Sequence, residues 1–227
     1  FLSKKRFYAN SKNYIDFVND TLNAETFAND KFIDIKSTDA KIEIADVATN
    51  GVYADIVRVA SRNVITGKYV DTEFKFAECA LFKKTDNKKQ PTAAAFVGKF
   101  FDAKNNLKFE GNIVINISRS EPVDVPNAID NRAKLYTDGS VTVYGDEGAD
   151  FRAIIGEQFF GNLKKIEPID HLLNLSISIW EGHTFAFMSY DDDVIALPFD
   201  KAINADAFKS FTTDLKKVFE AINLLGK

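Results

Sequence analysis

The sequence contains a single cysteine, Cys79, among its 227 residues. One cysteine excludes an intramolecular disulfide and is typical of a reducing compartment. The two histidines, His171 and His183, are not accompanied by an HExxH motif, a CxxC pair or a glycine-rich phosphate-binding loop. A histidine metal site would need both residues to meet across the fold. No serine lies in a Gly-x-Ser-x-Gly elbow. The sequence therefore indicates no catalytic residue and no cofactor.

Long apolar runs and an excess of positive charge are also missing. No uninterrupted apolar run reaches about 18 residues, the length that a membrane-spanning helix requires. The formal net charge is -4, so the chain has no overall basic field to hold a phosphate backbone. This composition disfavours nucleic acid as a partner. The local cluster of Lys83, Lys84, Lys88 and Lys89 lies among polar residues, a pattern typical of a solvated loop.

Phenylalanine, by contrast, is abundant, with 21 residues. Most of these rings are expected in a hydrophobic core, because aromatic side chains bury large apolar areas. A second interpretation is that some rings line an apolar groove for a lipid, a peptide or a partner helix. With 45% hydrophobic residues, the chain can bury a core without a disulfide or a metal.

Hydrophobic periodicity predicts an α+β fold, with one or more antiparallel sheets. Long helices are predicted over Phe7–Asn29 at the N-terminus, Gly148–Ile166 in mid-chain and Ala205–Leu225 at the C-terminus, and all three are expected to pack on the sheet. Alternating residues and turn signals predict an antiparallel meander. Its predicted strands are Lys41–Val47, a segment through Ile56–Val59, Phe74–Phe82, Ala94–Phe101, Leu107–Ile117, a hairpin over Lys134–Tyr144 turning at Asp138-Gly139, Leu173–Trp180 with an Asn/Ser face, and Thr184–Tyr190.

The domain organisation is less sharply defined. Pro122 and Pro126 interrupt the pattern, since prolines four residues apart suit neither a helix interior nor a central strand. Residues 121–127 are therefore a candidate lobe boundary, although one compact domain over residues 1–227 is the favoured interpretation.

The first residues suggest a membrane-proximal setting. Phe1-Leu2 is followed at once by Lys4, Lys5 and Arg6, which resembles the end of an apolar segment at the cytoplasmic interface. An ordinary charged helix start explains the same residues equally well. If a membrane-spanning region precedes Phe1, the positive-inside bias predicts that this domain faces the cytoplasm.

The densest carboxylate cluster is Asp191-Asp192-Asp193. Hard cations such as Ca²⁺ prefer oxygen ligands of this kind. However, adjacent residues of an extended strand point to opposite faces, so three in a row rarely chelate one ion. A solvated turn is the favoured interpretation, and a metal-dependent hydrolase that uses these residues is an alternative.

Several apolar motifs resemble an uncharacterised bacterial family known as domain of unknown function 3137. The resemblance covers most of the chain and rests on Val143-Tyr144-Gly145-Asp146, Phe151–Ile155, Phe159-Phe160, Phe74–Phe82, Phe96–Phe101 and Phe109-Glu110-Gly111. It implies hydrophobic spans ahead of this region and brings no known activity.

These observations lead to one hypothesis and two alternatives. The hypothesis is a membrane-tethered domain on the cytoplasmic side that binds a protein or peptide partner, or has a structural role, without catalysis. The alternatives are the metal-dependent hydrolase and a module that binds a lipid or another small apolar ligand.

Overall fold

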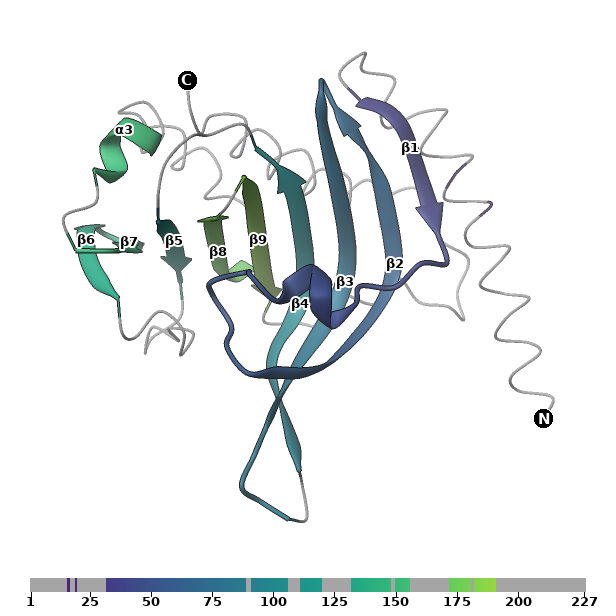
Figure 1. Ribbon diagram of the computed structural model, residues 1–227, viewed down its shortest axis with the longest axis horizontal. Coiled ribbons are helices and arrows are strands. Elements are labelled where there is room, and N and C mark those ends of the chain that lie inside the picture. The colour runs from purple at the N-terminus through teal and green to yellow at the C-terminus, as the bar shows by residue number, and fades with distance from the viewer. Residues whose placement is uncertain are drawn as a thin grey trace.

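The computed structural model describes Asp16, Asn19 and residues 32–88, 91–105, 111–119, 132–147, 150–155, 172–180 and 182–190. In this part of the chain, nine strands form one sheet (Figure 1). The strands are β1 (Phe32–Thr38), β2 (Ile56–Tyr69), β3 (Thr72–Lys84), β4 (Thr92–Lys104), β5 (Asn112–Ser118), β6 (Ala133–Asp138), β7 (Val141–Gly145), β8 (Leu172–Trp180) and β9 (His183–Tyr190). Two short helices accompany them, α2 (Ile44–Val47) and α3 (Phe151–Ile155).

The sheet joins two halves of the chain. Its strand order is β1-β2-β3-β4-β9-β8-β5-β7-β6, and all neighbouring strands are antiparallel. β2, β3 and β4 follow one another as in the predicted meander, whereas the outer strand β1 was not predicted. The second half departs from it, because β9 pairs with β4 and β8 pairs with both β9 and β5. The single β4 to β9 pairing therefore connects the two halves of the sheet.

The predicted α+β class with long helices is wrong, because the described part of the chain is mostly β. Its two helices have four and five residues. The mid-chain helix expected over Gly148–Ile166 is described only at α3. The ranges Phe7–Asn29, apart from Asp16 and Asn19, and Ala205–Leu225 lie outside the described residues, as does the candidate boundary at 121–127.

The predicted strand over Lys41–Val47 is also wrong, since α2 lies there. The backbone N–H of Glu43 donates to Asp46 Oδ2 at 2.8 Å, which satisfies a donor at the helix start. Ile42 and Val47 are buried whereas Ile44 is 44% exposed, so the apolar residues of this segment follow a helical turn rather than an alternating strand. The other predicted strands and the turn at Asp138-Gly139 are confirmed, although the strand predicted over Leu107–Ile117 is described only from Asn112 onward.

A segment that we call the strap, residues 39–55, connects β1 to β2 by crossing one face of the sheet. Figure 1 shows α2 of the strap in front of β3 and β4. Buried Ile42, Val47 and Val52 of the strap share a hydrophobic cluster with Phe100 and Phe187 of the sheet. This contact explains part of the phenylalanine content as core packing.

Aromatic rings hold the strap in place. The Tyr53 ring lies 5.3 Å from the Phe96 centroid and 5.1 Å from the Phe187 centroid. Phe96 and Phe187 themselves meet edge to face at 5.3 Å. Such contacts are among the favoured arrangements of aromatic side chains.

The same face of β5 and β8 carries the predicted Asn/Ser ladder, and this ladder is buried. Ser176 Oγ donates to Asn116 Oδ1 at 2.8 Å, and Ser178 Oγ lies 3.4 Å from Asn112 Oδ1. Gly51 of the strap packs directly on Asn112 and Ser178 with a φ of 68°. A side chain at position 51 would overlap Asn112, so the strap requires glycine at this contact.

Candidate functional site

The residues predicted as sites from the sequence lie mostly outside the described part of the chain. Asp191, Asp192, Asp193, Lys4, Lys5 and Arg6 all fall there, as does His171. The metal-dependent hydrolase and the membrane-proximal basic cluster therefore stay predictions. Among the described residues, no helix is long and apolar enough to span a membrane, and no group of three His, Cys, Asp or Glu residues could hold a metal ion.

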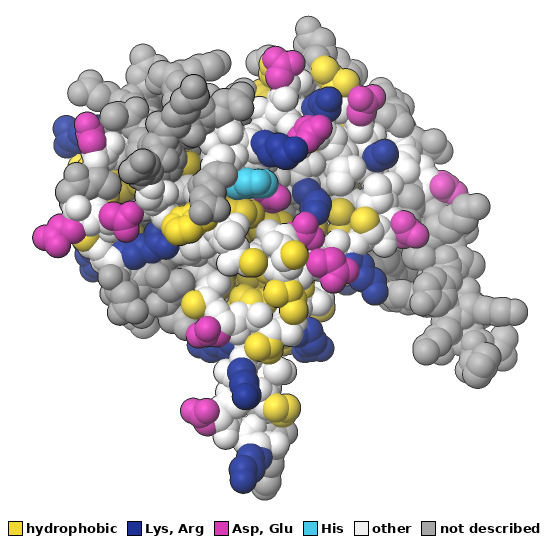
Figure 2. Space-filling model, in the orientation of Figure 1, with side chains coloured by type: hydrophobic (Ala, Val, Ile, Leu, Met, Phe, Trp, Pro, Cys, Tyr) yellow, Lys and Arg dark blue, Asp and Glu magenta, His cyan; other side chains and the backbone are white. Residues whose placement is uncertain are grey.

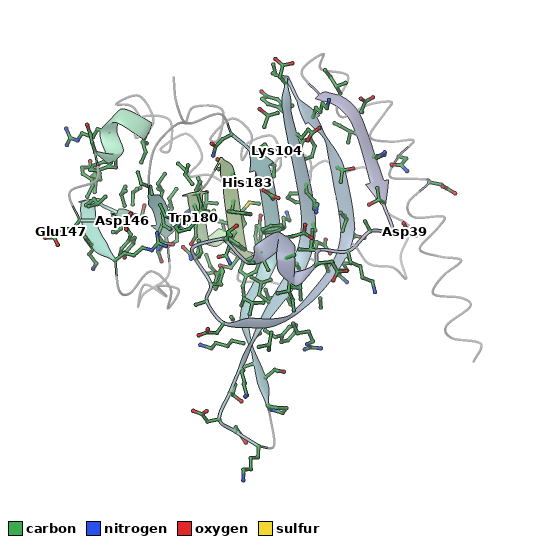
Figure 3. All side chains as sticks on the ribbon, viewed as in Figure 1. Asp39, Lys104, Asp146, Glu147, Trp180 and His183 are labelled. Carbon is green, nitrogen blue, oxygen red and sulfur yellow. The ribbon has the colours of Figure 1, made fainter. Side chains whose placement is uncertain are left out.

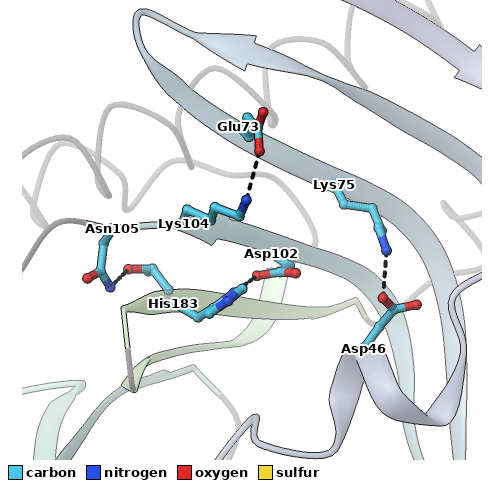
Figure 4. Close-up of polar contacts among 8 residues, drawn as sticks. Asp46, Glu73, Lys75, Asp102, Lys104, Asn105 and His183 are labelled. Atoms are coloured by element: carbon cyan, nitrogen blue, oxygen red, sulfur yellow. Dashed lines mark hydrogen bonds and ion pairs between the residues drawn. The ribbon is translucent and has the colours of Figure 1, made fainter.

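The described structure does bring together a polar cluster at one end of β3, β4 and β9 (Figure 4). Asp102 Oδ1 lies 2.8 Å from His183 Nδ1, and Lys75 Nζ lies 2.6 Å from Asp46 Oδ1 of the strap. Lys104 Nζ lies 3.0 Å from Glu73 Oε2. Strand alternation explains this arrangement, because Asp102 and Lys104 are two residues apart on β4 and so share a face.

The electrostatics of the cluster reflect its partial burial. Burial raises the pKa of the Asp102 carboxyl, although its hydrogen bond to His183 acts in the opposite direction. The His183 ring stacks on Phe185 with centroids 5.7 Å apart and an interplanar angle of 11°. Figure 3 shows His183 and Trp180 close together where β8 meets β9, whereas Asp146 and Glu147 lie at the far end of the sheet.

The partly buried Asp102 could orient the His183 imidazole as a general base, but a general base of this kind acts on a nucleophile held beside it. Cys79 is a poor candidate for one, because it is buried and burial raises the pKa of its thiol to about 12. Lys75, Lys104 and His183 each pair with a carboxylate. The geometry of these described residues therefore fits structural ion pairs and hydrogen bonds better than a catalytic centre.

A second feature is a projecting hairpin that we call the arm. It consists of Cys79–Lys84 of β3, Thr92–Val97 of β4 and the loop 85–91 between them. Figure 1 shows its two strands crossing and extending below the rest of the sheet, and Figure 2 shows basic, acidic and hydrophobic side chains along it. The backbone N–H of Thr85 donates to the Pro91 carbonyl at 3.0 Å, which closes the loop at its base. Of the lysines predicted in a loop, Lys88 lies in this loop, Lys83 and Lys84 end β3, and Lys89 lies outside the described residues.

The arm is anchored firmly at its base. Leu81 and Phe96 face each other in the strand register and are 0% and 5% exposed. The Arg58 guanidinium of β2 lies 3.7 Å from the centroid of the Phe82 ring, a favourable cation–π distance. Because buried and stacked side chains fix the base, the outer residues are presented on a rigid support.

One edge of the arm is open among the described strands. The β4 to β9 pairing begins at Lys99 opposite Met188. Gly98 packs against the main-chain carbonyl of Met188 so closely that a side chain there would overlap it. From Val97 back to Thr92, β4 pairs with β3 and with no other described strand. This edge ends in Val97, whose side chain is 52% exposed.

The composition of this edge distinguishes it from the two outer edges of the sheet. Natural sheet edges commonly carry charged residues that oppose pairing with another chain. The outer strand β1 has Asp34 and Lys36, and the outer strand β6 has Lys134 and Asp138. The six residues Thr92–Val97 carry no charge. The β4 edge is therefore the described edge best suited to accept a further strand.

Sequence reasoning found the two strands of the arm but missed its open edge. Whether Val97 is exposed depends on where β9 stops pairing with β4, and those strands are far apart in the sequence. The uncharged run of Thr92–Val97 is the signal that could have directed attention to it. The phenylalanine-lined groove for a lipid or small apolar ligand stays a prediction.

Comparisons with known proteins add little to this geometry. No family model matches the chain, so its resemblance to domain of unknown function 3137 stays a prediction. No curated protein matches it either. One solved structure is similar, the crystal structure of the mycobacterial trehalose monomycolate transport factor A, TtfA. The TM-score is 0.49 and the identity 12%, over 84% of this chain and 88% of that chain.

Proposed function

We propose that this protein is a non-catalytic binding module that engages a protein or peptide partner through the arm. The observation that carries the proposal is the open edge of β4. Thr92–Val97 combines an exposed apolar side chain with a strand edge that bears no charge. Adding a strand to such an edge is a recurring mode of peptide recognition, in which main-chain hydrogen bonds supply affinity.

The arm also has the rigidity that a binding element needs. Preorganised surfaces lose less conformational entropy when they bind, and that saving increases affinity. Phe96 on β4 is packed between Tyr53 of the strap and Phe187 of β9. The open edge therefore continues directly from the hydrophobic core.

A photo-crosslinking experiment in cells tests this function. A benzophenone amino acid replaces Val97 in the full-length protein, and a matched variant carries it at Ile33 on β1, which is 45% exposed. We expect a discrete crosslinked protein from position 97 and none from position 33. The partner, once identified and purified, should bind the unmodified protein and lose at least tenfold in affinity with V97D.

Ile33 also supplies the control substitution, I33D, which should leave the affinity for that partner unchanged. Equal crosslinking from positions 33 and 97, or equal affinity of V97D and the unmodified protein, would show that the arm is not the binding surface.

A membrane-tethered, cytoplasm-facing location belongs to the same proposal. It is supported by Lys4, Lys5 and Arg6 and by the family resemblance. The natural full-length protein should remain in the membrane fraction after alkaline extraction. Recovery in the soluble fraction would contradict this location without affecting the binding function.

A further inference from the structure

The side chains along and around the open edge of β4 indicate which class of partner this edge would bind. Resting on the binding function proposed above, we propose that the arm takes an extended acidic peptide segment, which adds as a further strand beside Thr92–Val97. Three properties of the described residues carry this proposal: the unpaired edge, the size of its side chains and the charges around it.

The edge provides the backbone groups for strand addition. Each non-proline residue of a strand has one N–H and one C=O, and edge positions direct alternate groups away from the sheet. β3 pairs with one side of Thr92–Val97, and the pairing of β9 with β4 begins only at Lys99. An extended peptide can satisfy the outward groups with a ladder of main-chain hydrogen bonds.

The side chains along this edge leave room for the partner's own. Ala93, Ala94 and Ala95 form a run of small residues, and Ala94 is exposed. Because successive side chains of a strand alternate between the two faces, an added strand would place its larger residues beside these alanines on both faces. The exposed Val97 offers an apolar contact at the inner end of the edge.

The charges near the arm favour an acidic occupant. Arg58, Lys84 and Lys88 are exposed and Lys83 is partly exposed. The acidic residues described in the same region are Asp55 and Asp86. The arm is therefore basic although the whole chain has a net charge of -4. A local positive field of this kind attracts acidic segments and increases their association rate.

Other anionic or self-complementary partners fit these properties less well. A second copy of the chain would bring a second basic arm against this one, and like charges repel. A nucleic acid or an anionic lipid surface can neutralise the lysines, but neither can supply a regular ladder of backbone hydrogen bonds. The combination of an open strand edge and basic side chains thus points to an acidic peptide.

A titration monitored by backbone amide NMR tests the inference on the full chain. The probe is a ten-residue peptide of alternating valine and glutamate. We expect it to shift the amide signals of Thr92–Val97 saturably and to protect these amides from hydrogen exchange. Its affinity should fall at least tenfold between low and high salt, because charge attraction is screened.

Two comparison peptides separate charge from strand addition. The same peptide with lysine in place of glutamate should not bind saturably. The acidic peptide methylated on every backbone nitrogen keeps its charge but cannot donate hydrogen bonds, and it should also fail. Equal binding of the methylated peptide would overturn strand addition, and equal binding of the lysine peptide would overturn the acidic preference.

A matched pair of protein variants tests the basic residues. K83E/K84E should weaken binding of the acidic peptide at least tenfold. K36E, which places a reversed charge on the exposed surface of β1, should leave binding unchanged. Circular dichroism tests whether each variant is folded. If K83E/K84E is unfolded, K88E replaces it, because Lys88 lies in the exposed loop. An equal effect of the arm and β1 substitutions would overturn the role of the arm lysines.

The remaining outcomes identify a different partner. Anionic phosphatidylglycerol vesicles that shift the same amides as strongly as the acidic peptide would replace the peptide with a lipid surface. Concentration-dependent dimers that shift those amides would replace it with a second copy. A crosslinked protein at position 97 together with no peptide binding would leave the binding function standing and overturn only the acidic-strand inference.

Discussion

Glu78 shows how a charged residue comes to lie inside this sheet. Its side chain is 3% exposed, and its Oε2 accepts hydrogen bonds from Arg62 Nε at 2.5 Å and Asn63 Nδ2 at 3.1 Å. Lys99, opposite Glu78 in the register, is also 3% exposed. Lys99 Nζ lies 4.7 Å from the centroid of the Tyr190 ring. Burial raises the pKa of Glu78 despite the nearby Arg62.

This raised pKa predicts a pH dependence of stability. Because the folded protein holds the Glu78 proton more tightly than the unfolded chain, the stability linked to Glu78 is complete below the unfolded pKa near 4.5 and is lost as pH rises through the higher folded pKa. Relative to E78Q, the wild-type free energy of unfolding should therefore fall as pH increases above about 4.5. Urea unfolding of both proteins across pH 4 to 8 measures the difference.

The neutral glutamine in E78Q keeps the size of the side chain and one acceptor oxygen, so E78Q is itself the control for packing. A difference between wild type and E78Q that stays constant, or increases with pH, would show that burial does not dominate at this site.

Sequence alone predicts the face of Glu78 but not its surroundings. Alternation over Thr72–Phe82 places Phe74, Phe76 and Glu78 on one face of the strand. A charged residue in such a pattern ordinarily indicates a face exposed to solvent. The partners that accompany its burial, Arg62 and Lys99, are on two other strands, and no local pattern brings them together.

At the scale of elements, strands were more predictable than the surfaces they create. The alternating runs over Phe74–Phe82 and Ala94–Phe101 correctly indicate β3 and β4, because alternation is a local consequence of strand geometry. Among the described residues, the arm is formed by the part of β4 that pairs with β3 beyond the last β4–β9 pair, Lys99 with Met188. The projection of the arm is therefore determined by how the strands pair, and the sequence of a single strand does not reveal it.

The tip of the arm is expected to contribute little to stability. Replacing residues 84–92 with Asn-Gly would join Lys83 to Ala93, which face each other in the register, by a two-residue hairpin turn. Lys84, Asp86 and Lys88 in the removed segment are exposed. We expect the free energy of unfolding to change by less than about 1 kcal/mol, since exposed residues contribute little.

Chemical denaturation of the shortened protein measures this change. The buried Leu81 and Phe96 remain in place and act as the internal control for the base of the arm. A loss of several kcal/mol, as expected for removal of core residues, would mean that the tip is part of the structural core.

For the whole molecule, the strap holds both halves of the sheet together. Its α2 end pairs Asp46 with Lys75 on β3, while its Gly51 end packs on Asn112 of β5 and Ser178 of β8. Asn50 fixes the turn between these ends, because its Oδ1 accepts hydrogen bonds from the backbone N–H groups of Val52 and Tyr53 at 2.8 and 2.7 Å.

Gly51→Ala should therefore destabilise the whole fold. Gly139 in the β6–β7 turn is a matched control, since its φ of 56° is close to the 68° of Gly51 but no atom lies within 4 Å of its added side chain. We expect Gly139→Ala to cost about 1–2 kcal/mol from backbone strain. Gly51→Ala should cost a further 1–3 kcal/mol or so from overlap with Asn112.

Thermal unfolding of the two variants measures the comparison, and hydrogen exchange at β5 and β8 locates the damage. Equal destabilisation by the two alanines would show that strap packing adds nothing beyond the conformation of the turn.

The order of the strands in the sheet was the feature that the sequence predicted least well. The meander prediction holds from β2 to β4 and fails where β9 pairs with β4, because the order of strands in a sheet is fixed by pairings between distant segments. The Asn/Ser face of β8 was correctly predicted, but its burial comes from packing that the alternation does not encode. The alternation over Lys41–Val47 wrongly predicted a strand. The apolar residues of the strap pack on the face of the sheet and do not form one of its strands.

The strap also has a consequence for synthesis of the protein. Chains emerge from the ribosome with the N-terminal end first. Ile42, Val47 and Val52 are therefore made well before Phe185 and Phe187, with which they share their hydrophobic cluster. Until β9 emerges, this cluster lacks Phe185 and Phe187, and transiently exposed apolar surface of this kind makes incompletely folded chains prone to aggregation.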